Sequence, residues 1–119
     1  YNAVIVRDAS NNITMYINGV SRATGSYSGA LATPGLQSNS YNFTGLVDEY
    51  AMWDSDQSSN ISAIYNYGAP GDITSLNPVG WWRMGDNDSG TGTTITDQGS
   101  GGNDGTLVNG PTFSTNVPS

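Results

Sequence analysis

"ITMYINGV", residues 13–20, is the stretch that decides the fold class of this chain. Residues 13–17 alternate in character with a period of two, which is typical of a half-buried β-strand. Asn18-Gly19 follows, and this dipeptide is the strongest short-range signal for a hairpin because a type I′ turn requires positive φ at both central residues. Residues 20–24 then read as the returning strand. The sequence therefore predicts a β-hairpin centred on Asn18-Gly19.

Further strand-like runs flank this hairpin. Residues 3–7 (AVIVR) form a β-branched burst that ends in the turn-rich residues 8–12. Residues 25–40 are rich in Ser, Gly, Ala and Pro and read as a loop with one short strand near Leu36. Residues 43–53 (FTGLVDEYAMW) form a long strand candidate with apolar residues at both odd and even positions. That pattern is typical of a strand inside a sandwich and not at its solvated edge.

A single short helix is expected after this strand. Residues 54–59 read as a loop that leads into a helix N-cap, and Ile61, Ile64 and Tyr65 have the i, i+3, i+4 spacing of an apolar helix face. Gly68 stands where a C′ glycine commonly ends a helix. We expect a connecting helix of about two or three turns.

The later part of the chain is poorer in large apolar residues. Residues 69–79 read as a turn-rich linker, and residues 80–86 (GWWRMGD) read as a short aromatic strand. Residues 87–103 are dense in Gly, Asp, Ser and Thr. Residues 105–110 read as one more short strand. Frequent Gly and Pro between such short runs are typical of an all-β chain.

Composition argues against several classes of function. Three basic residues stand against ten acidic ones, and the net charge of −7 repels nucleic-acid phosphates and anionic lipid. The sequence has no cysteine, which excludes disulfides and thiolate zinc sites, and no histidine, which removes the commonest general base. No segment is apolar for the length that crosses a bilayer, and the first residues show no signal-peptide pattern. The chain begins inside an expected strand, which predicts a processed or incomplete polypeptide.

Three blocks in the correct order resemble a known family. Residues 4–19, from "VIVRD" to "ITMYING", are similar to a hairpin of laminin-G-like, concanavalin A-like domains. Residues 43–53 are similar to their "F-x-G-x-I-D-E-V-x-I-W" strand, and residues 61–66 (ISAIYN) to the short helix that follows it. The resemblance covers roughly residues 3–68. The stretch "WWRMGD…GGNDGTL" that begins at Trp81 is similar to the opening of such a domain and to segments that trail these modules in phage virion proteins.

The resemblance implies an all-β fold, an antiparallel β-sandwich of the jelly-roll type with one short helix. Residues 1–68 would carry its later strands and the helix, residues 69–79 the linker, and residues 80–119 an aromatic, Gly-rich segment that completes this or a neighbouring sandwich. The opening strands of the jelly roll are missing upstream, so we expect a partial sandwich, completed by the C-terminal segment or by a partner chain. The tail is expected to order only if something holds Phe113 and Val117.

The same resemblance implies a place and a function. It indicates an extracellular or virion-surface protein, of the kind found in phage virions and on bacterial surfaces. The first hypothesis is a non-enzymatic structural module of a tail fibre, capsid decoration or surface filament that self-associates as a homo-oligomer or polymer. The alternative is a lectin-like adhesion module that binds a cell-surface glycan. The fold alone does not choose between them.

The carboxylates of the long strand argue against a glycan-active enzyme. Related folds host glucanases whose catalytic carboxylates lie two and four residues apart on one face of a strand. Asp48 and Glu49 are adjacent, so in a strand they point to opposite faces and cannot act together as an acid/base pair. We expect Asp48 to bond to neighbouring backbone, and we assign no catalytic residue.

Trp81 and Trp82 are the candidates for a carbohydrate-binding or interface surface. A sugar-stacking platform and a core or interface anchor are both known uses of tryptophan, and the second is commoner in a chain with few large apolar residues. Consecutive residues of a strand point opposite ways, so one ring is expected to face out of its own layer.

Calcium is the one metal that the sequence suggests, and only weakly. The string from Asp86 to Gly90 (DNDSG) puts the oxygen ligands Asp86 and Asp88 at alternate positions, but no bidentate glutamate follows at the spacing of an EF-hand. A turn built from Asx-type residues explains the string more simply. Asp97 and Asp104 would join such a site only if the fold brought them near.

Four N-x-S/T sequons are candidate glycosylation sites. Several are expected by chance in a chain rich in Asn and Ser. Asn12 fits best because it lies in a predicted turn. The four residues are Asn12, Asn42, Asn60 and Asn87.

Overall fold

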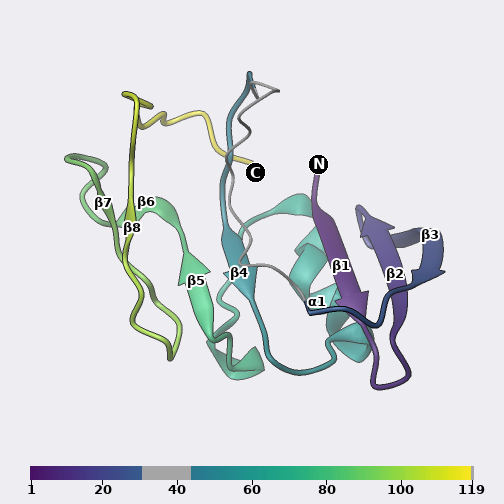
Figure 1. Cartoon of the computed structure of the whole chain (residues 1–119). Helices are drawn as coiled ribbons and strands as arrows, with labels where there is room; N and C mark the ends of the chain where they lie inside the picture. Colours follow the sequence, from purple (N-terminus) through teal and green to yellow (C-terminus); the bar gives the residue numbers. More distant parts are fainter. Residues whose placement is uncertain (31–43, 119) are drawn as a thin grey trace.

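The computed structural model describes residues 1–30 and 44–118 of the chain. Within them short antiparallel strands dominate and helix is confined to brief connections, so the predicted all-β class is confirmed. Figure 1 shows the strands in two groups, with β1, β2 and β3 on one flank and β4, β5, β7 and β8 on the other. The strand expected near Leu36 and the sequon at Asn42 lie outside the described residues.

The N-terminal group is a three-stranded antiparallel meander in which neighbours in sequence are neighbours in the sheet. Short polar turns between β-branched runs produce this arrangement, because each strand returns directly beside the previous one. The strand predicted at residues 3–7 is confirmed. The three strands are β1 (Ala3–Arg7), β2 (Asn12–Ile17) and β3 (Val20–Ser26).

The predicted hairpin turn joins β2 to β3. Asn18 and Gly19 have φ of 50° and 76°, the positive values that a type I′ turn requires. Asn18 also holds the start of β1, since it donates its main-chain N–H to Asn2 O and accepts the Asn2 N–H on its Oδ1, both at 2.9 Å. A Cβ at Gly19 would lie 2.9 Å from Cδ1 of Tyr65, so glycine alone fits both this contact and the positive φ.

One face of the meander packs on the predicted helix. Val4 and Val6 of β1 form a buried cluster with Ile61, and Tyr16 and Ile64 pack against it. The even-numbered side chains of β1 therefore face the helix, and the odd-numbered ones face away from it. Among the described residues no helix combines the length and apolarity needed to cross a membrane. The helices are α1 (Ile61–Tyr65) and three 3-10 turns at Ser58–Asn60, Asn66–Gly68 and Thr74–Leu76.

The predicted C-terminus of the helix is wrong by two residues. Asn66 and Tyr67 already have φ of 40° and 56°, so the chain leaves the right-handed helix before it reaches Gly68. Asparagine tolerates the left-handed conformation better than other non-glycine residues, which lets Asn66 take the capping position expected of Gly68.

The long strand predicted at residues 43–53 is wrong in its extent. Phe43 lies outside the described residues, and only β4 (Tyr50–Met52) is strand. Glu49 has φ of 52°, a left-handed conformation that lies outside the regular strand region and precedes the first residue of β4. Within the described residues β4 pairs only with β5, so it lies at an edge and not in the interior of a sheet as predicted.

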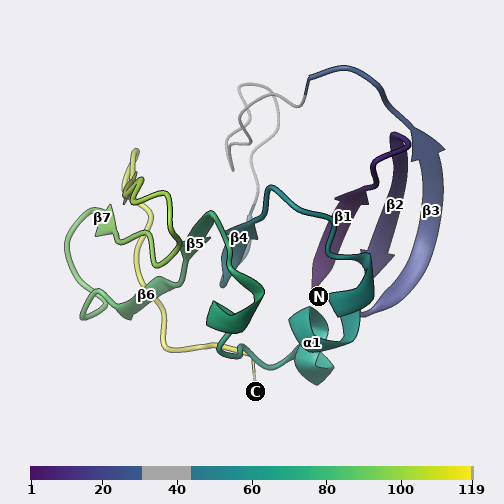
Figure 2. The same ribbon diagram turned by 90° about the horizontal axis from the view of Figure 1, so that it is seen from below.

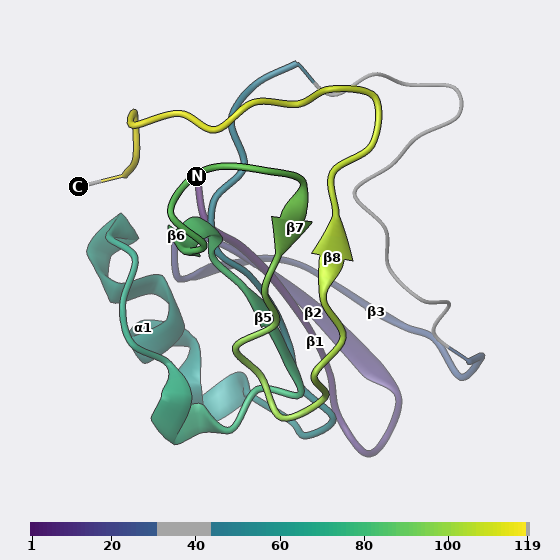
Figure 3. The ribbon, with the colours of Figure 1, turned by 90° about the vertical axis from the view of Figure 1, so that its left-hand side faces the viewer.

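The C-terminal group is built from very short strands (Figure 3). The predicted aromatic strand at residues 80–86 is divided at Arg83 into two short strands, and Met84 and Gly85 of the second have φ of 50° and 126°. Of the strand predicted at residues 105–110, only the first two residues are strand, and β7 was not predicted. The elements are β5 (Gly80–Trp82), β6 (Met84–Asn87), β7 (Thr94–Ile95) and β8 (Gly105–Thr106), with β5 paired to β4 and β7 to β8.

The tail is held at one of the two expected residues. Phe113 is half-buried, and its ring lies so close to Gly85 that a Cβ there would be 2.7 Å from Phe113 Cδ1. Val117 is 53% exposed. The tail up to residue 118 contains no helix or strand.

Burial is shallow throughout the described residues. Their buried hydrophobic side chains are Val4, Val6, Ile61, Trp81 and Ile95, and none is less than 2% exposed. Several large hydrophobic residues are exposed instead, among them Ile5, Leu46 and Val20. Contiguous exposed apolar surface commonly marks a site of interaction with a partner.

Candidate functional site

The two tryptophans of β5 make different contacts on opposite sides of the β4–β5 pair. Trp81 is 5% exposed, and its Nε1–H donates to Glu49 Oε2 at 2.6 Å. Trp82 stands opposite Tyr50 in the ladder, with ring centroids 5.7 Å apart, and its Nε1–H donates to Asn103 O at 2.9 Å. Trp81 therefore offers no ring face to a ligand, and Trp82 offers only part of one.

Arg83, which follows β5, forms ion pairs with Glu49, which precedes β4, and with Asp86. Arg83 donates its Nε–H to Glu49 Oε1 at 2.8 Å, and its second amino group lies 3.0 Å from Asp86 Oδ2. Burial opposes the charge on Arg83, but bonding to Glu49 outweighs it, so the pKa of Arg83 is raised. Burial raises the pKa of Asp48, and the nearby charges of Glu49 and Asp86 raise it further. The surroundings of Asp48 therefore disfavour its ionised form.

The carboxylate of Asp97 organises the turns beyond β5. It is 8% exposed, with Oδ1 accepting the main-chain N–H of Trp81 and of Gly99 and Oδ2 that of Asn103, each at 2.8 Å. Burial opposes ionisation of Asp97, but these three bonds outweigh it and lower its pKa. The N–H of Asp97 in turn donates to Asp104 Oδ1 at 2.9 Å. Asp97 is a structural residue because its acceptor oxygens are all used.

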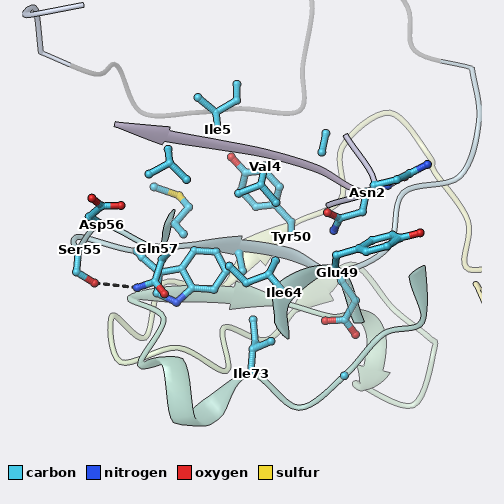
Figure 4. Close-up of a pocket in the computed structure, with 18 of the residues that line it drawn as sticks. Asn2, Val4, Ile5, Glu49, Tyr50, Ser55, Asp56, Gln57, Ile64 and Ile73 are labelled. Atoms are coloured by element: carbon cyan, nitrogen blue, oxygen red, sulfur yellow. Dashed lines mark hydrogen bonds between the residues drawn. The ribbon is translucent and has the colours of Figure 1, made fainter. Parts of the chain in front are cut away.

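An open groove of about 1320 Å³ lies between β1 and β4. Consecutive residues of both strands line it, so it runs along the strand edges and not along one face. Figures 1 and 2 agree, with β2 and β3 beyond β1 and β5 beyond β4. In Figure 4 Val4 and Ile5 project from opposite sides of β1. The volume exceeds the roughly 300–1,000 Å³ of pockets for small molecules.

The groove combines apolar walls with an acidic lining. Val4, Ile64 and Ile73 supply apolar side chains from three different parts of the chain. Among the described residues that line it, Arg7 alone is basic, and its guanidinium donates to Gly29 O at 2.8 Å. The lining carboxylates are Asp8, Asp48, Glu49, Asp54 and Asp56.

Two polar atoms in the wall of the groove lack hydrogen-bond partners within the described residues. They are Oδ1 of Asn2, an acceptor, and Nε1 of Trp53, a donor, and both are shielded from solvent. An unpartnered buried polar group costs about 1–3 kcal/mol. Gln57, buried in the same wall, is satisfied by Ser55 and Asn60. Buried polar atoms near Asn2 and Trp53 thus lack hydrogen bonds, whereas the side-chain amide of Gln57 has them.

A second apolar surface lies on the face of the meander that points away from α1. Ile5 is 70% exposed there and stands opposite Met15, which stands opposite Ala23 in the next ladder. A shallow depression of about 310 Å³ lies over this face. Its lining residues are Ile5, Ile13, Met15, Ala23, Thr24, Gly25 and Ser26.

The carboxylates considered for calcium have partners within the protein. Asp86 is paired with Arg83, and Asp88 accepts both the main-chain N–H and the hydroxyl of Thr96. Asp97 and Asp104 are joined to each other through a main-chain bond and not through a shared ligand. Across residues 1–30 and 44–118 there is no cluster of three His, Cys, Asp or Glu residues that could hold a metal ion.

The described sequons differ in how free the asparagine amide is. Asn12 is exposed, but its Nδ2 donates to Asp8 Oδ2 at 2.8 Å. Asn60 is half-buried and donates to Gln57 Oε1 at 2.8 Å. Asn87 is exposed and has only a long contact of 3.5 Å to Gln98 Oε1. Asn87 thus has the most accessible amide of the three.

The sequence did not reveal the roles of Glu49, Arg83 and Asp97. Glu49 and Arg83 are 34 residues apart, and no local pattern marks such a pair. Asp97 carries a weak signal, because an Asp followed by a Gly-rich string often accepts bonds from its own turn. The groove has no signal in the sequence because it depends on how two sheets are placed.

No protein-family model, no curated protein and no solved structure matches this chain.

Proposed function

We propose that this chain is a non-enzymatic assembly module of the laminin-G-like, jelly-roll type, which joins copies of itself in a virion or an extracellular filament. The contact surface in this proposal is the face of the meander that points away from α1. The observation that carries it is the exposure of Ile5, which is 70% exposed beside the apolar side chains of Ile13 and Met15. Apolar residues at directly opposed positions form a continuous surface, and covering it removes apolar area from water.

The edge of the meander supports the same proposal. β3 is exposed along its whole length, and within the described residues its outer edge is unpaired. An exposed edge strand is a template for pairing with another chain. A copy that covers the apolar face would lie beside this edge, so the two features favour a single interface.

The carbohydrate-binding alternative has less support. Trp81 is 5% exposed, and the ring of Trp82 packs on Tyr50. Glycan binding that is lost in Trp82→Ala, with self-association unchanged, would favour this alternative.

Sedimentation velocity over a range of protein concentrations tests the proposal. We expect the sedimentation coefficient to rise with concentration, and more so at high salt, because screening weakens repulsion between chains of net charge −7. Ala23→Lys puts a charge on the exposed apolar face and should weaken association at least tenfold. Thr115→Lys adds the same charge in the exposed tail and should leave association unchanged. A chain that stays monomeric at all concentrations, or equal effects of the two variants, would refute the proposal.

A further inference from the structure

The groove between β1 and β4 is bordered by two strand edges that both present unused main-chain groups. Asn2 bonds to Asn18 and Asp8 to Asn12, so the even-numbered residues of β1 are the ones bonded to β2. Hydrogen bonding alternates along an antiparallel strand. The N–H and C=O groups of the odd-numbered residues, Ala3, Ile5 and Arg7, therefore point toward the groove.

The edge of β4 also presents unused main-chain groups to the groove, at its central residue Ala51. Trp81, opposite Ala51, donates its N–H to Asp97 and accepts the N–H of Gln98, so both of its main-chain groups point away from β4. By the same alternation Ala51 turns its N–H and C=O away from β5 and toward the groove. Within the described residues none of these groups on either edge has a hydrogen-bond partner.

The direction of the two strands fixes how a chain segment would enter. Figure 1 shows that β1 and β4, the two strands that border the groove, run the same way. A segment placed between them can run antiparallel to both, which gives the more stable form of strand pairing on each side. Its side chains would alternate between the face of α1, where Val4 and Val6 lie, and the opposite face, where Ile5 lies.

The lining of the groove restricts the chemistry of that segment. The walls near α1 are apolar, so side chains on that face should be apolar and small or β-branched. Five carboxylates line the groove against one arginine, so the flanks of the segment should be basic.

A second copy of this chain does not fit these requirements. Every strand of the described meander already has a neighbour on at least one side, whereas the occupant needs both of its edges free. The tail, residues 111–118, contains no strand and has two prolines and no basic residue. The net charge of −7 also opposes entry of a second copy into an acidic groove.

We propose that the groove between β1 and β4 binds an extended segment of a different protein, with alternating β-branched apolar residues and basic flanks, which adds a strand antiparallel to both edges. Strand addition takes its affinity from main-chain bonds and its specificity from alternate side chains. This interaction uses the main-chain edges of β1 and β4, whereas the proposed self-association uses a side-chain face of the meander. The two surfaces share Ile5, and Ala23→Lys, which changes that face alone, distinguishes failure of one proposal from failure of the other.

Fluorescence anisotropy with the labelled peptide Lys-Thr-Val-Thr-Val-Thr-Lys tests the proposal on the full chain. We expect saturable binding that weakens as salt is added. Replacing the central Thr of the peptide by Pro removes a main-chain donor, and replacing both Lys by Glu reverses the flanking charge. Each change should weaken binding at least tenfold. Absence of saturable binding, or equal binding of all three peptides, would overturn the proposal.

A matched pair of protein variants tests the edge of β1. Ile5→Pro removes an N–H that points to the groove and is not used by β2, a position at which edge strands tolerate proline. Ile5→Thr keeps that N–H while changing the same exposed side chain. We expect Ile5→Pro to weaken peptide binding at least tenfold and Ile5→Thr by less than about twofold. Equal losses in the two variants would contradict strand pairing at β1.

A further test uses the wild-type protein and therefore does not depend on whether Ile5→Pro folds. It follows the indole N–H signals in a ¹⁵N-correlated NMR spectrum as peptide is added. Trp53 lines the groove, and its Nε1–H has no partner among residues 1–30 and 44–118, whereas the Nε1–H groups of Trp81 and Trp82 are bonded to Glu49 and Asn103. The peptide should shift the Trp53 signal, assigned with Trp53→Phe, and leave the other two in place. A shift confined to the other two, or release of a bound second copy by the peptide, would overturn the proposal.

Discussion

The meander and the segment after residue 80 are held together by different kinds of bond. β1 and β2 share a ladder of five residue pairs, and one face of the meander packs its apolar side chains on α1. The ladders of the C-terminal group are two or three pairs long. There the carboxylates of Asp88, Asp97 and Asp104 accept main-chain N–H groups that a longer ladder would have used. A chain with few apolar residues can thus order its turns with anionic acceptors, which form stronger hydrogen bonds than neutral ones.

Removing the carboxylate of Asp97 should cause the largest loss of stability in the C-terminal group. Asp97→Ala leaves the N–H groups of Trp81, Gly99 and Asn103 without their acceptor. Hydrogen bonds to charged groups contribute about 1.5–3 kcal/mol each and are not additive, so we expect the free energy of unfolding to fall by about 3 kcal/mol. Urea denaturation followed by tryptophan fluorescence measures it. Asp104→Ala, which removes one bond at an exposed residue, should cost about 1 kcal/mol, and an equal loss would show that Asp97 has no special role.

A pair of glycine substitutions compares the packing of the two regions. A Cβ at Gly99 would lie 2.7 Å from the main-chain Cα of Gly80, and the backbone must move to accept it. Gly25, in β3 of the meander, has no atom within 4 Å of its Cβ position. Overpacking costs about 1–3 kcal/mol, so Gly99→Ala should destabilise the protein by about 2 kcal/mol.

Gly25→Ala serves as the control and should change stability by less than about 0.5 kcal/mol. Thermal unfolding followed by circular dichroism compares the two variants. A larger loss in Gly25→Ala than in Gly99→Ala would mean that the meander, and not the C-terminal group, is the more tightly packed region.

Protonation of Asp97 in acid should lower the free energy of unfolding, by less than Asp97→Ala or Gly99→Ala does. The pKa of Asp97 lies below its ordinary value of 3.8, so the native state binds fewer protons than the unfolded state. Asp97 therefore contributes stability above that value and loses it as the pH falls through its native pKa. Asp48, whose pKa is raised, contributes with the opposite sign.

Comparison of the wild type with Asp97→Asn isolates the contribution of Asp97, because Asp48 is present in both proteins. Below pH 3.8 the free energy of unfolding should fall more steeply with acid in the wild type than in the variant. Urea midpoints measured at several pH values provide the comparison. Parallel slopes in the two proteins would exclude a contribution from the ionised carboxylate.

The sequence predicted the meander well and the C-terminal group poorly, for a physical reason. The Asn18-Gly19 turn and the β-branched run at residues 3–7 are local signals, and each specifies its structure without help from distant residues. Residues 44–49 were predicted to be strand but are not, and this segment contains Glu49, whose partners Trp81 and Arg83 lie more than thirty residues away. A periodic pattern cannot show that such a residue will leave the strand conformation to reach its partners.

For the candidate sites too, local features could be predicted from the sequence and long-range contacts could not. The alternation of strand residues predicted that one of the two rings faces out of its own layer; in the structure Trp81 is 5% exposed and Trp82 packs on Tyr50. That Trp81 is buried against Glu49 could not be predicted, because it depends on the pairing of β4 with β5. The groove depends on the relative placement of two sheets, and no pattern within either strand encodes that placement.

The pairing of β4 with β5 has a consequence for the order in which the molecule forms. The turns of the meander close loops of a few residues, whereas the bond between Glu49 and Trp81 closes a loop of 32 residues. The entropy lost on closing a loop grows with its length, and long-range contacts slow folding. The meander is therefore the natural nucleus, formed early and locally, and the β4–β5 pair is a late addition. Before β4 pairs with β5, the free edge of β1 is already formed, but β4, the opposite wall of the groove, is not yet in place.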